Sequence, residues 1–337
     1  MSYLYPILTP WGIAFIGSLV LVPLVRALAL RIQFVDLPNN RKVHTRPLAL
    51  LGGVGIYGAF ALAVILTIPL DPPVLGIMGG AGLLMILGLI DDRRGMQPLV
   101  KLAGQAVAGI IVIACGVKVN FLGVSFLNIP FTLLWLVGIT NAFNLLDNMD
   151  GLSSGVASIS ALTFAAIAAR YIYLGPEQNQ ALVFSAALSG ACLGFLRYNL
   201  HRASIFMGDA GSMVLGFVLA SIASLGSWHS ATITTSILIP ILVLSYPIFD
   251  TILVTLLRWQ RGVPFYLGGK DHSSHRLVNL GLSKLEAVLL IYLFSLTQAL
   301  AAVLVSSVTF RLALMAVFMS VCTFFIFGVV LRKAPID

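Results

Sequence analysis

The chain has 337 residues, of which 59% are hydrophobic and only 9% are charged, and its formal net charge is +8. Soluble domains carry about 25% charged residues, so this composition excludes an ordinary water-soluble globular protein. Uncharged apolar runs such as Gly53–Leu70, Pro73–Ile90 and Leu312–Leu331 approach or reach the roughly 20 residues that span a bilayer as a helix. The sequence therefore predicts an all-α, polytopic integral membrane protein.

Eleven apolar segments are expected to be transmembrane helices. In chain order they lie at 8–30, 52–70, 73–91, 100–117, 129–147, 152–172, 180–197, 211–227, 232–257, 285–306 and 311–331. Placing the N-terminus outside assigns seventeen Lys and Arg residues to one face and leaves three, Lys118, Arg170 and Arg311, at the other. The positive-inside rule then predicts an N-terminus outside and a cytoplasmic C-terminus.

The connections between these segments differ on the two predicted faces. The cytoplasmic loops, at 31–51, 92–99, 198–210 and 258–284, are longer and more polar, so the function is expected there. Outside, alternation around Gly123 predicts a small hairpin near 118–129. No soluble domain is evident, and residues 1–337 are read as one integral membrane domain. The basic loops are explained by this orientation and not by nucleic acid binding.

Ten of the twelve carboxylates lie at or near the predicted cytoplasmic face. Asp91 and Asp92 end the third span, Asp147 and Asp150 follow the fifth, and Asp209 precedes the eighth. Acids at membrane depth are costly and usually functional. Read singly, each could be an interfacial charge or a helix cap. Read together, they predict one functional cluster at three helix ends.

The acid cluster also contains amide side chains, which suit a hard cation. Asn144 and Asp147 are three residues apart and therefore share one helix face. Mg²⁺ takes carboxylate oxygens, keeps several waters and often shares the phosphates of a substrate. Magnesium is the predicted ion, with Mn²⁺ as an alternative.

Two basic loops supply the opposite charge. One contains Lys42 and His44 before Gly52-Gly53, and the other contains His272, His275 and Arg276 after two glycines. Arg side chains and glycine-rich backbone can surround a pyrophosphate. Positive loops also meet anionic lipid headgroups, and a histidine pair three residues apart can bind zinc. The neighbouring carboxylates favour magnesium over zinc.

Six motifs in this order carry a family resemblance: DLPNNRKVH, GLIDD, NAFNLLDNMDGL, FMGDAGS, PIFDT and DHSSHR. Together they resemble the bacterial polyprenyl-phosphate N-acetylhexosamine-1-phosphate transferases. That superfamily also contains the phospho-N-acetylmuramoyl-pentapeptide transferase of peptidoglycan synthesis. The resemblance covers positions 36 to 277.

The resemblance implies a reaction between a lipid phosphate and a nucleotide sugar. The expected substrates are undecaprenyl (polyprenyl) phosphate and a UDP-N-acetylhexosamine, with N-acetylglucosamine the favoured sugar. The products would be UMP and the lipid-linked diphospho-sugar that initiates a cell-envelope polysaccharide, with Mg²⁺ required. The expected location is the plasma (inner) membrane with a cytoplasmic active site. Small residues in 52–88 are compatible with packing inside the protomer or across a homodimer.

Matching positions imply roles for individual residues. The metal ligands would be Asp209, Asn144 and Asp147. Asn199 and Phe206 fall where the family contacts the uracil, and Asp150 falls near the nucleoside. The remaining expected site residues are catalytic Asp91, Asp92 and Lys42, and substrate-binding His272, His275, Arg276 and His44.

Two departures from the family pattern bear on this interpretation. Ser273 and Ser274 separate His272 from His275 where many members have further histidines, and Gly95 replaces a lysine typical of the pentapeptide branch. The second departure favours the N-acetylhexosamine branch. The pentapeptide transferase remains an alternative. An ion-coupled transporter is a distant one, because transporters place acids near the midplane and often contain inverted repeats.

Overall fold

The computed structural model describes residues 5–36, 47–119, 125–226, 228, 233–264 and 269–335. Within these ranges the chain forms thirteen α-helices, a short 3₁₀ helix (Ile172–Leu174) and two short strands, β1 (Val35–Asp36) and β2 (Leu48–Ala49). The α-helices are α1 (Tyr5–Arg31), α2 (Gly52–Thr67), α3 (Pro72–Arg94), α4 (Pro98–Ala114), α5 (Ser125–Leu146), α6 (Leu152–Arg170), α7 (Pro176–Asn199), α8 (Gly208–Leu225), α9 (Ile233–Val243), α10 (Ser245–Gln260), α11 (Ser273–Asn279), α12 (Lys284–Val305) and α13 (Phe310–Arg332).

The long helices confirm the all-α polytopic architecture. In the described part of the chain, eight helices are long and apolar enough to cross a membrane, and the bent pair α9–α10 adds a ninth. Two shorter apolar helices, α2 and α4, lie at the remaining predicted positions. These elements coincide in chain order with the eleven predicted segments. Which face of the membrane holds the N-terminus stays a prediction.

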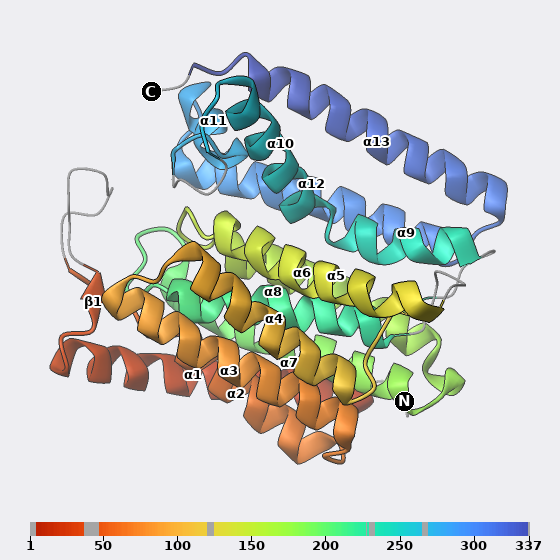
Figure 1. Ribbon diagram of the computed structural model, residues 1–337, viewed down its shortest axis with the longest axis horizontal. Helices are drawn as coiled ribbons and strands as arrows, with labels where there is room; N and C mark the ends of the chain where they lie inside the picture. Colours follow the sequence, from red (N-terminus) through yellow and green to blue (C-terminus); the bar gives the residue numbers. More distant parts are fainter. Residues whose placement is uncertain are drawn as a thin grey trace.

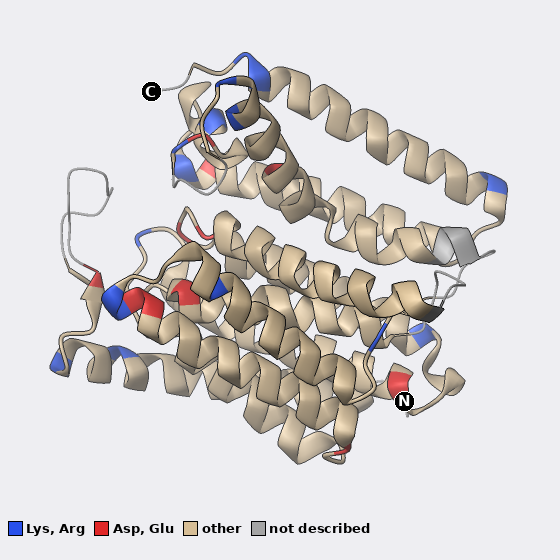
Figure 2. Cartoon of the chain, viewed as in Figure 1, with Lys and Arg blue, Asp and Glu red and all other residues tan. Residues whose placement is uncertain are grey.

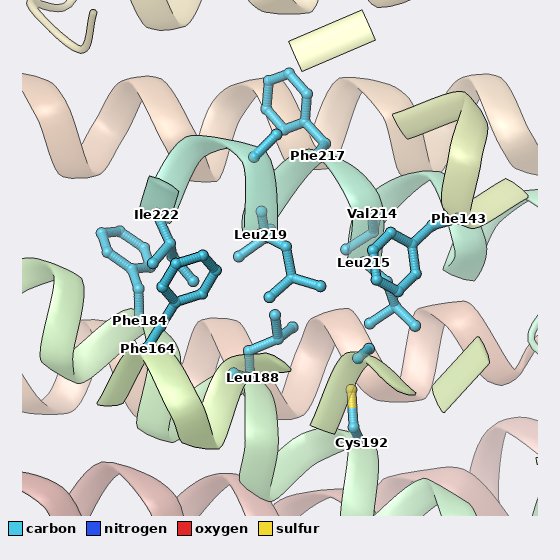
Figure 3. Close-up of a cluster of buried hydrophobic side chains, with 14 of the residues drawn as sticks. Phe143, Phe164, Phe184, Leu188, Cys192, Val214, Leu215, Phe217, Leu219 and Ile222 are labelled. Atoms are coloured by element: carbon cyan, nitrogen blue, oxygen red, sulfur yellow. The ribbon is translucent and has the colours of Figure 1, made fainter. Parts of the chain in front are cut away.

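Helix α8 forms the centre of the bundle. Of its 18 residues, 94% are buried, and the helix packs against α2, α3, α5, α6 and α7. A helix that is apolar on every side is covered by neighbours on every side. Figure 3 shows its side chains Leu215, Leu219 and Ile222 among Phe143 and Phe164. In helix α13, by contrast, only 11% of an 18-residue apolar stretch is buried, and most of the apolar surface of this helix is exposed.

Glycines allow two helices to approach the start of α8 very closely. A Cβ placed on Gly53 of α2 would lie 2.3 Å from the backbone nitrogen of Gly211, and one on Gly88 of α3 would lie 2.3 Å from the backbone of Ala210. No side chain fits at such distances, so these positions need glycine. These two glycines of the 52–88 segment therefore pack inside the protomer, and a homodimer stays a prediction.

Helices α9 to α13 form a second group that covers one side of the bundle (Figure 1). Helix α12 packs on α6, and α10 packs on α5. The chain bends by 73° between α9 and α10, around Leu244. Pro240 inside α9 has no N–H to donate, which weakens that helix just before the bend. The bend directs α10 toward α11, near the C-terminus (Figure 1).

The predicted hairpin at 118–129 is wrong in its second half. Residues 125–129 form the first turns of α5. The alternating pattern there joins directly to the apolar run that follows, and a lipid-facing helix can accommodate it. Residues 120–124 lie outside the described ranges.

Charged side chains gather at one end of the molecule, the end at which the C-terminus lies (Figure 2). Two of the predicted cytoplasmic loops are joined there by backbone hydrogen bonds. Strand β1 pairs with β2, the Phe206 N–H donates to the Ala49 carbonyl (2.9 Å), and the Gly52 N–H donates to the Phe206 carbonyl (2.9 Å). These bonds hold the loop before α8 against the loop before α2.

Candidate active site

Four helix ends meet at the charged end of the bundle. The last turn of α3 carries Asp91 and Asp92, the first turn of α4 carries Lys101, the last turn of α5 carries Asn144, and the first turn of α8 carries Asp209. The sequence predicts that the acids at three helix ends, Asp147 among them, lie at one level. The structure joins Asp91, Asp92 and Asp209 by hydrogen bonds, whereas Asp147 lies beside them without such a bond among the described residues.

The ammonium group of Lys101 lies at the centre of this cluster. Its Nζ is 2.6 Å from Asp209 Oδ2, 2.9 Å from Asp91 Oδ2 and 3.0 Å from Asn144 Oδ1. The three oxygens come from three different helices. Lys101 therefore ties α3, α5 and α8 together through charge-assisted hydrogen bonds.

Asn144 is held in place by α8. Its Nδ2 donates to Asp209 Oδ1 (2.7 Å) and to the Ser212 hydroxyl (2.9 Å). Because both donors of the amide face α8, the amide oxygen faces Lys101. Asn144 and Asp209, which the sequence assigns to one metal site, are in direct contact.

Asp92 caps helix α8 from a neighbouring helix. Its carboxylate accepts hydrogen bonds from the backbone N–H groups of Asp209 (2.9 Å) and Ala210 (3.3 Å). These are first-turn donors without an intrahelical partner, and the helix dipole favours a negative charge beside them. Gly208 has φ +69°, and a Cβ there would lie 2.4 Å from Asp92 Oδ2. Glycine at this position lets the carboxylate reach the helix end.

Asp147 lies just beyond the end of α5, beside the cluster. Burial, followed by the negative charges of Asp209, Asp92 and Asp150, raises its pKa well above the usual range. Among the described residues, none donates a hydrogen bond to its carboxylate. Without a cation beside it, Asp147 therefore favours its protonated form, and a bound cation would favour the carboxylate.

The donor set at Lys101 Nζ fits a hard divalent cation. The described residues contain no group of three His, Cys, Asp or Glu side chains arranged around one point. Two carboxylates and one amide oxygen do converge there, and Asp147 is near. Mg²⁺ typically uses one or two carboxylates and completes its shell with water and substrate phosphate, so this set suits it.

The residues expected near the nucleoside organise two loops. The side chain of Asn199 accepts from the Gly151 N–H (2.9 Å) and donates to the Ile205 carbonyl (2.9 Å). Asp150 Oδ2 accepts from the Ala203 N–H (3.0 Å). Asn199 is buried, and both ends of its amide have protein partners, so the structure gives it a positioning role between the loops.

Phe206 is placed differently from Asn199. Its backbone is fixed by the bonds to Ala49 and Gly52, and its side chain is half-buried. An aromatic ring with a partly open surface on a fixed backbone can take a stacked base.

His272 belongs to a buried network between α10 and α11. Its Nδ1 is 2.8 Å from Asp250 Oδ2, while Asp250 Oδ1 accepts from the Ser273 N–H (2.7 Å). The Ser273 hydroxyl also contacts the hydroxyl of Tyr246 (2.6 Å). A histidine held through Nδ1 by a carboxylate has a fixed ring orientation.

The remaining polar residues of this loop are Arg276 and Asp271, which are buried, and His275, which is half-buried. Arg276 is 1% exposed and donates to the carbonyls of Asp271 (2.8 Å) and Leu331 (3.3 Å), so it holds the loop together. Burial raises the pKa of Asp271, but the combined hydrogen bonds and charges around it, chiefly those of Arg258, outweigh burial. The pKa of Asp271 therefore lies below its usual range. Burial, together with the positive charges of His272 and Lys270, lowers the pKa of His275 to about 4.

Sequence reasoning missed two site residues. Lys101 is the one charged residue of the predicted span 100–117. A charge in an apolar segment is energetically costly and usually functional, and this could have pointed to Lys101. Asp250 lies in the PIFDT motif, but nothing in the sequence pairs it with His272. Lys42 and His44, expected at the site, lie outside the described residues.

The start of α11 also contacts the segment that follows α5. The Ser274 hydroxyl donates to Asn148 Oδ1 (2.6 Å), two residues beyond the end of α5. The second helix group is thus tied to the main bundle beside Asp147.

Comparison with known proteins gives a consistent set of relatives. Glycosyl transferase family 4 matches residues 74–227. The chain is 37% identical over 320 residues to a probable undecaprenyl-phosphate N-acetylglucosaminyl 1-phosphate transferase of Bacillus subtilis (strain 168), covering 91% of this chain and 88% of the relative. It is 35% identical over 306 residues to the decaprenyl-phosphate N-acetylglucosaminephosphotransferase of Mycolicibacterium smegmatis, covering 80% and 75%. It is 27% identical over 326 residues to the undecaprenyl-phosphate alpha-N-acetylglucosaminyl 1-phosphate transferase of Escherichia coli K12, covering 92% and 86%.

These matches and the apolar helices define a multi-pass membrane transferase. The chain belongs to the polyprenyl-phosphate N-acetylglucosaminyl-1-phosphate transferase family, within glycosyl transferase family 4. It is an enzyme of this phosphotransferase type.

Proposed function

We propose that the chain transfers N-acetylglucosamine-1-phosphate from UDP-N-acetylglucosamine to undecaprenyl phosphate, releasing UMP. The main support is the direct contact between Asn144 and Asp209, whose oxygens face one cation position beside Asp147. The names of the relatives support the lipid phosphate and the sugar. The product would be the lipid-linked diphospho-sugar that begins a cell-envelope polysaccharide.

The proposed reaction is a phosphoryl transfer. An oxygen of the lipid phosphate attacks the phosphorus bonded to the sugar, and the bond from that phosphorus to the bridging oxygen of the diphosphate breaks. The leaving group is UMP, which takes the electron pair of that bond. Phosphoryl transfer depends mainly on positioning and on stabilisation of developing charge.

A bound Mg²⁺ or Mn²⁺ would neutralise charge on the reacting diphosphate. Asp209, Asn144 and Asp147 would hold this ion. Asp92 keeps the first turn of α8, and therefore Asp209, in place. Phe206 would stack on the uracil, and Asp150 would help to shape the nucleoside loop.

Basic side chains would bind the phosphates and the sugar. We assign this role to His272, oriented by Asp250, and to His275, with Lys42 and His44 from the loop before α2. Arg276 would act through the position of that loop. His275, with its pKa of about 4, would act at neutral pH as a neutral hydrogen-bonding group.

Asp91 and Asp92 are assigned positioning roles in place of a general-base role. A phosphate monoester has a second pKa near 6, so the lipid phosphate is mostly a dianion at pH 7 to 8. A base has little left to remove. Asp92 instead holds α8, and Asp91 holds Lys101.

The expected site of action is the cytoplasmic face of the plasma membrane. The concentration of Lys and Arg at the charged end supports this orientation through the positive-inside rule.

Release of UMP by purified protein tests the proposal. The protein is supplied with undecaprenyl phosphate, Mg²⁺ and a panel of nucleotide sugars that includes UDP-N-acetylglucosamine and UDP-N-acetylmuramoyl-pentapeptide. UMP release with UDP-N-acetylglucosamine is expected. Release only with the pentapeptide substrate would assign the chain to the other branch, and no release with any substrate would contradict the proposal.

A further inference from the structure

Both carboxylate oxygens of Asp209 already have partners inside the protein. Oδ1 accepts from Asn144 Nδ2 (2.7 Å), and Oδ2 accepts from Lys101 Nζ (2.6 Å). Asn144 also has its oxygen 3.0 Å from the same Nζ. A divalent cation that binds these oxygens therefore has to displace the ammonium group of Lys101.

Asp91 offers Lys101 a second position. Asp91 Oδ1 accepts from the Met96 backbone N–H (2.7 Å), which anchors this carboxylate to the turn after α3. Its other oxygen, Oδ2, lies 2.9 Å from Lys101 Nζ. If Lys101 leaves Asp209, it keeps an ion pair that is already formed.

The charge balance of the cluster calls for one cation at a time. In the described part of the chain, Lys101 is the basic side chain that pairs with Asp91 and Asp209. Without it, these two acids would repel each other and the nearby Asp92 and Asp147. With a divalent ion also on Asp209, the ammonium and the metal would repel each other in a poorly screened, half-buried site.

We propose that Lys101 is a resident cation that takes the place of the divalent ion when the metal is absent. On metal binding, its ammonium leaves Asp209 and Asn144 and remains on Asp91. Lys101 thus stabilises the metal-free site and weakens metal binding by competing for the same oxygens. This inference rests on the proposed metal dependence.

Binding of Mn²⁺ without nucleotide or lipid tests this competition. The loss of the free Mn²⁺ signal in electron paramagnetic resonance gives the affinity for chelator-treated protein. Removing a competing charge changes affinity by a typical coupling factor, so Lys101→Met should bind Mn²⁺ at least about fivefold more tightly than the wild type. The control is Lys118→Met, an exposed lysine at the other end, which should bind as the wild type does. Equal or weaker binding by Lys101→Met would overturn the inference.

Thermal unfolding provides a second readout. In chelator, Lys101→Met should unfold at a lower temperature than the wild type, because its acids lack a counter-charge. Saturating Mn²⁺ should raise its midpoint more than that of the wild type and narrow the difference. A difference that does not narrow with Mn²⁺ would indicate a purely structural lysine.

The wild-type protein supplies a test that needs no folded variant. Labelling by an amine-reactive reagent, measured by mass spectrometry, should become faster at Lys101 when Mn²⁺ is added and stay constant at Lys118. Unchanged or slower labelling of Lys101 would overturn the inference. If the wild type binds no Mn²⁺ and releases UMP without a divalent ion, the proposed metal dependence fails instead. If the wild type binds Mn²⁺ and only the Lys101 results disagree, the resident-cation role alone fails.

Discussion

The carboxylate of Asp92 caps the helix on which Asp209 lies, with Asp92 Oδ1 2.9 Å from the Asp209 backbone nitrogen. Two neighbouring acids of one motif therefore have different partners: Asp92 holds the start of α8, and Asp91 holds Lys101. The GLIDD motif thus orients the metal-site residue from two directions.

Asp92→Asn should lower the transfer rate at every pH and lower the thermal stability. The two N–H groups of α8 donate to different oxygens of Asp92, so an asparagine keeps only one acceptor for them, and its amide carries no charge beside the helix dipole. The measurements are a pH–rate profile of UMP release and the unfolding midpoint. Asp91→Asn, which leaves the α8 cap intact, is the matched variant. Recovery of either variant toward the wild-type rate above pH 8 would instead support a general base.

Asp147→Asn should stabilise the protein in chelator at neutral pH. The pKa of Asp147 is raised in the folded state, so between its unfolded and folded pKa the folded state binds more protons. The contribution of Asp147 to the free energy of unfolding therefore falls as pH rises between these two pKa values. A neutral amide does not titrate, so the variant avoids this loss of stability. Unfolding midpoints of both proteins against pH measure this effect.

The same Asp147→Asn variant should lose stabilisation by Mg²⁺ and lose activity. A variant that is less stable than the wild type in chelator at neutral pH would contradict the prediction, because it would show that other groups stabilise the wild-type carboxylate.

His275→Gln should lose less stability on acidification than the wild type. The wild-type pKa is lowered to about 4, whereas histidine in an unfolded chain has a pKa near 6.5. Between these values the unfolded state binds more protons, so wild-type stability falls as pH falls from about 6.5 to about 4. Unfolding midpoints at pH 7, 5.5 and 4.5 give the comparison. Parallel curves for the two proteins would contradict the lowered pKa.

Phe206→Ala should raise the KM for the UDP-sugar with little change in kcat. Stacking of a base on an aromatic ring contributes about 1–3 kcal/mol, and the backbone bonds of Phe206 do not depend on its side chain. Steady-state kinetics of UMP release measure it, and Phe206→Tyr should keep the wild-type KM. An unchanged KM in Phe206→Ala would remove the uracil from this loop.

Asn199→Ala is a useful contrast to Phe206→Ala. It breaks bonds to both Gly151 and Ile205, so it should lower the unfolding midpoint as well as nucleotide affinity. Phe206→Ala keeps the backbone bonds to Ala49 and Gly52 and should lower the midpoint less than Asn199→Ala does.

The sequence predicts the helices well because hydropathy is a local property of the chain. Each predicted span corresponds to an apolar helix or bent pair, and the acids at their ends were visible as motifs. The hairpin failed because an alternating apolar stretch before Pro130 also suits a lipid-facing helix. The bend at Leu244 lies inside one predicted span, 232–257, and mean hydropathy gives no sign of a break there.

Contacts between distant residues were beyond the reach of sequence patterns. Lys101 of α4 and Asp209 of α8 are 108 positions apart, and both helices pack on α3, whose Gly88 lies directly against Ala210. The same limit applies to the internal partners of Asn199 and Arg276, which the family resemblance placed toward the substrate. Burial of Arg276 depends on α13, far along the chain.

Transfer of a sugar phosphate, as opposed to the sugar alone, is the central claim. UDP-N-acetylglucosamine labelled at the phosphorus bonded to the sugar is incubated with purified protein, undecaprenyl phosphate and Mg²⁺, with Asp209→Asn as the inactive control. The label should move entirely into the lipid fraction while unlabelled UMP is released, and neither should occur with Asp209→Asn. Label that leaves in UDP, with the lipid unlabelled, would contradict phosphoryl transfer at this site.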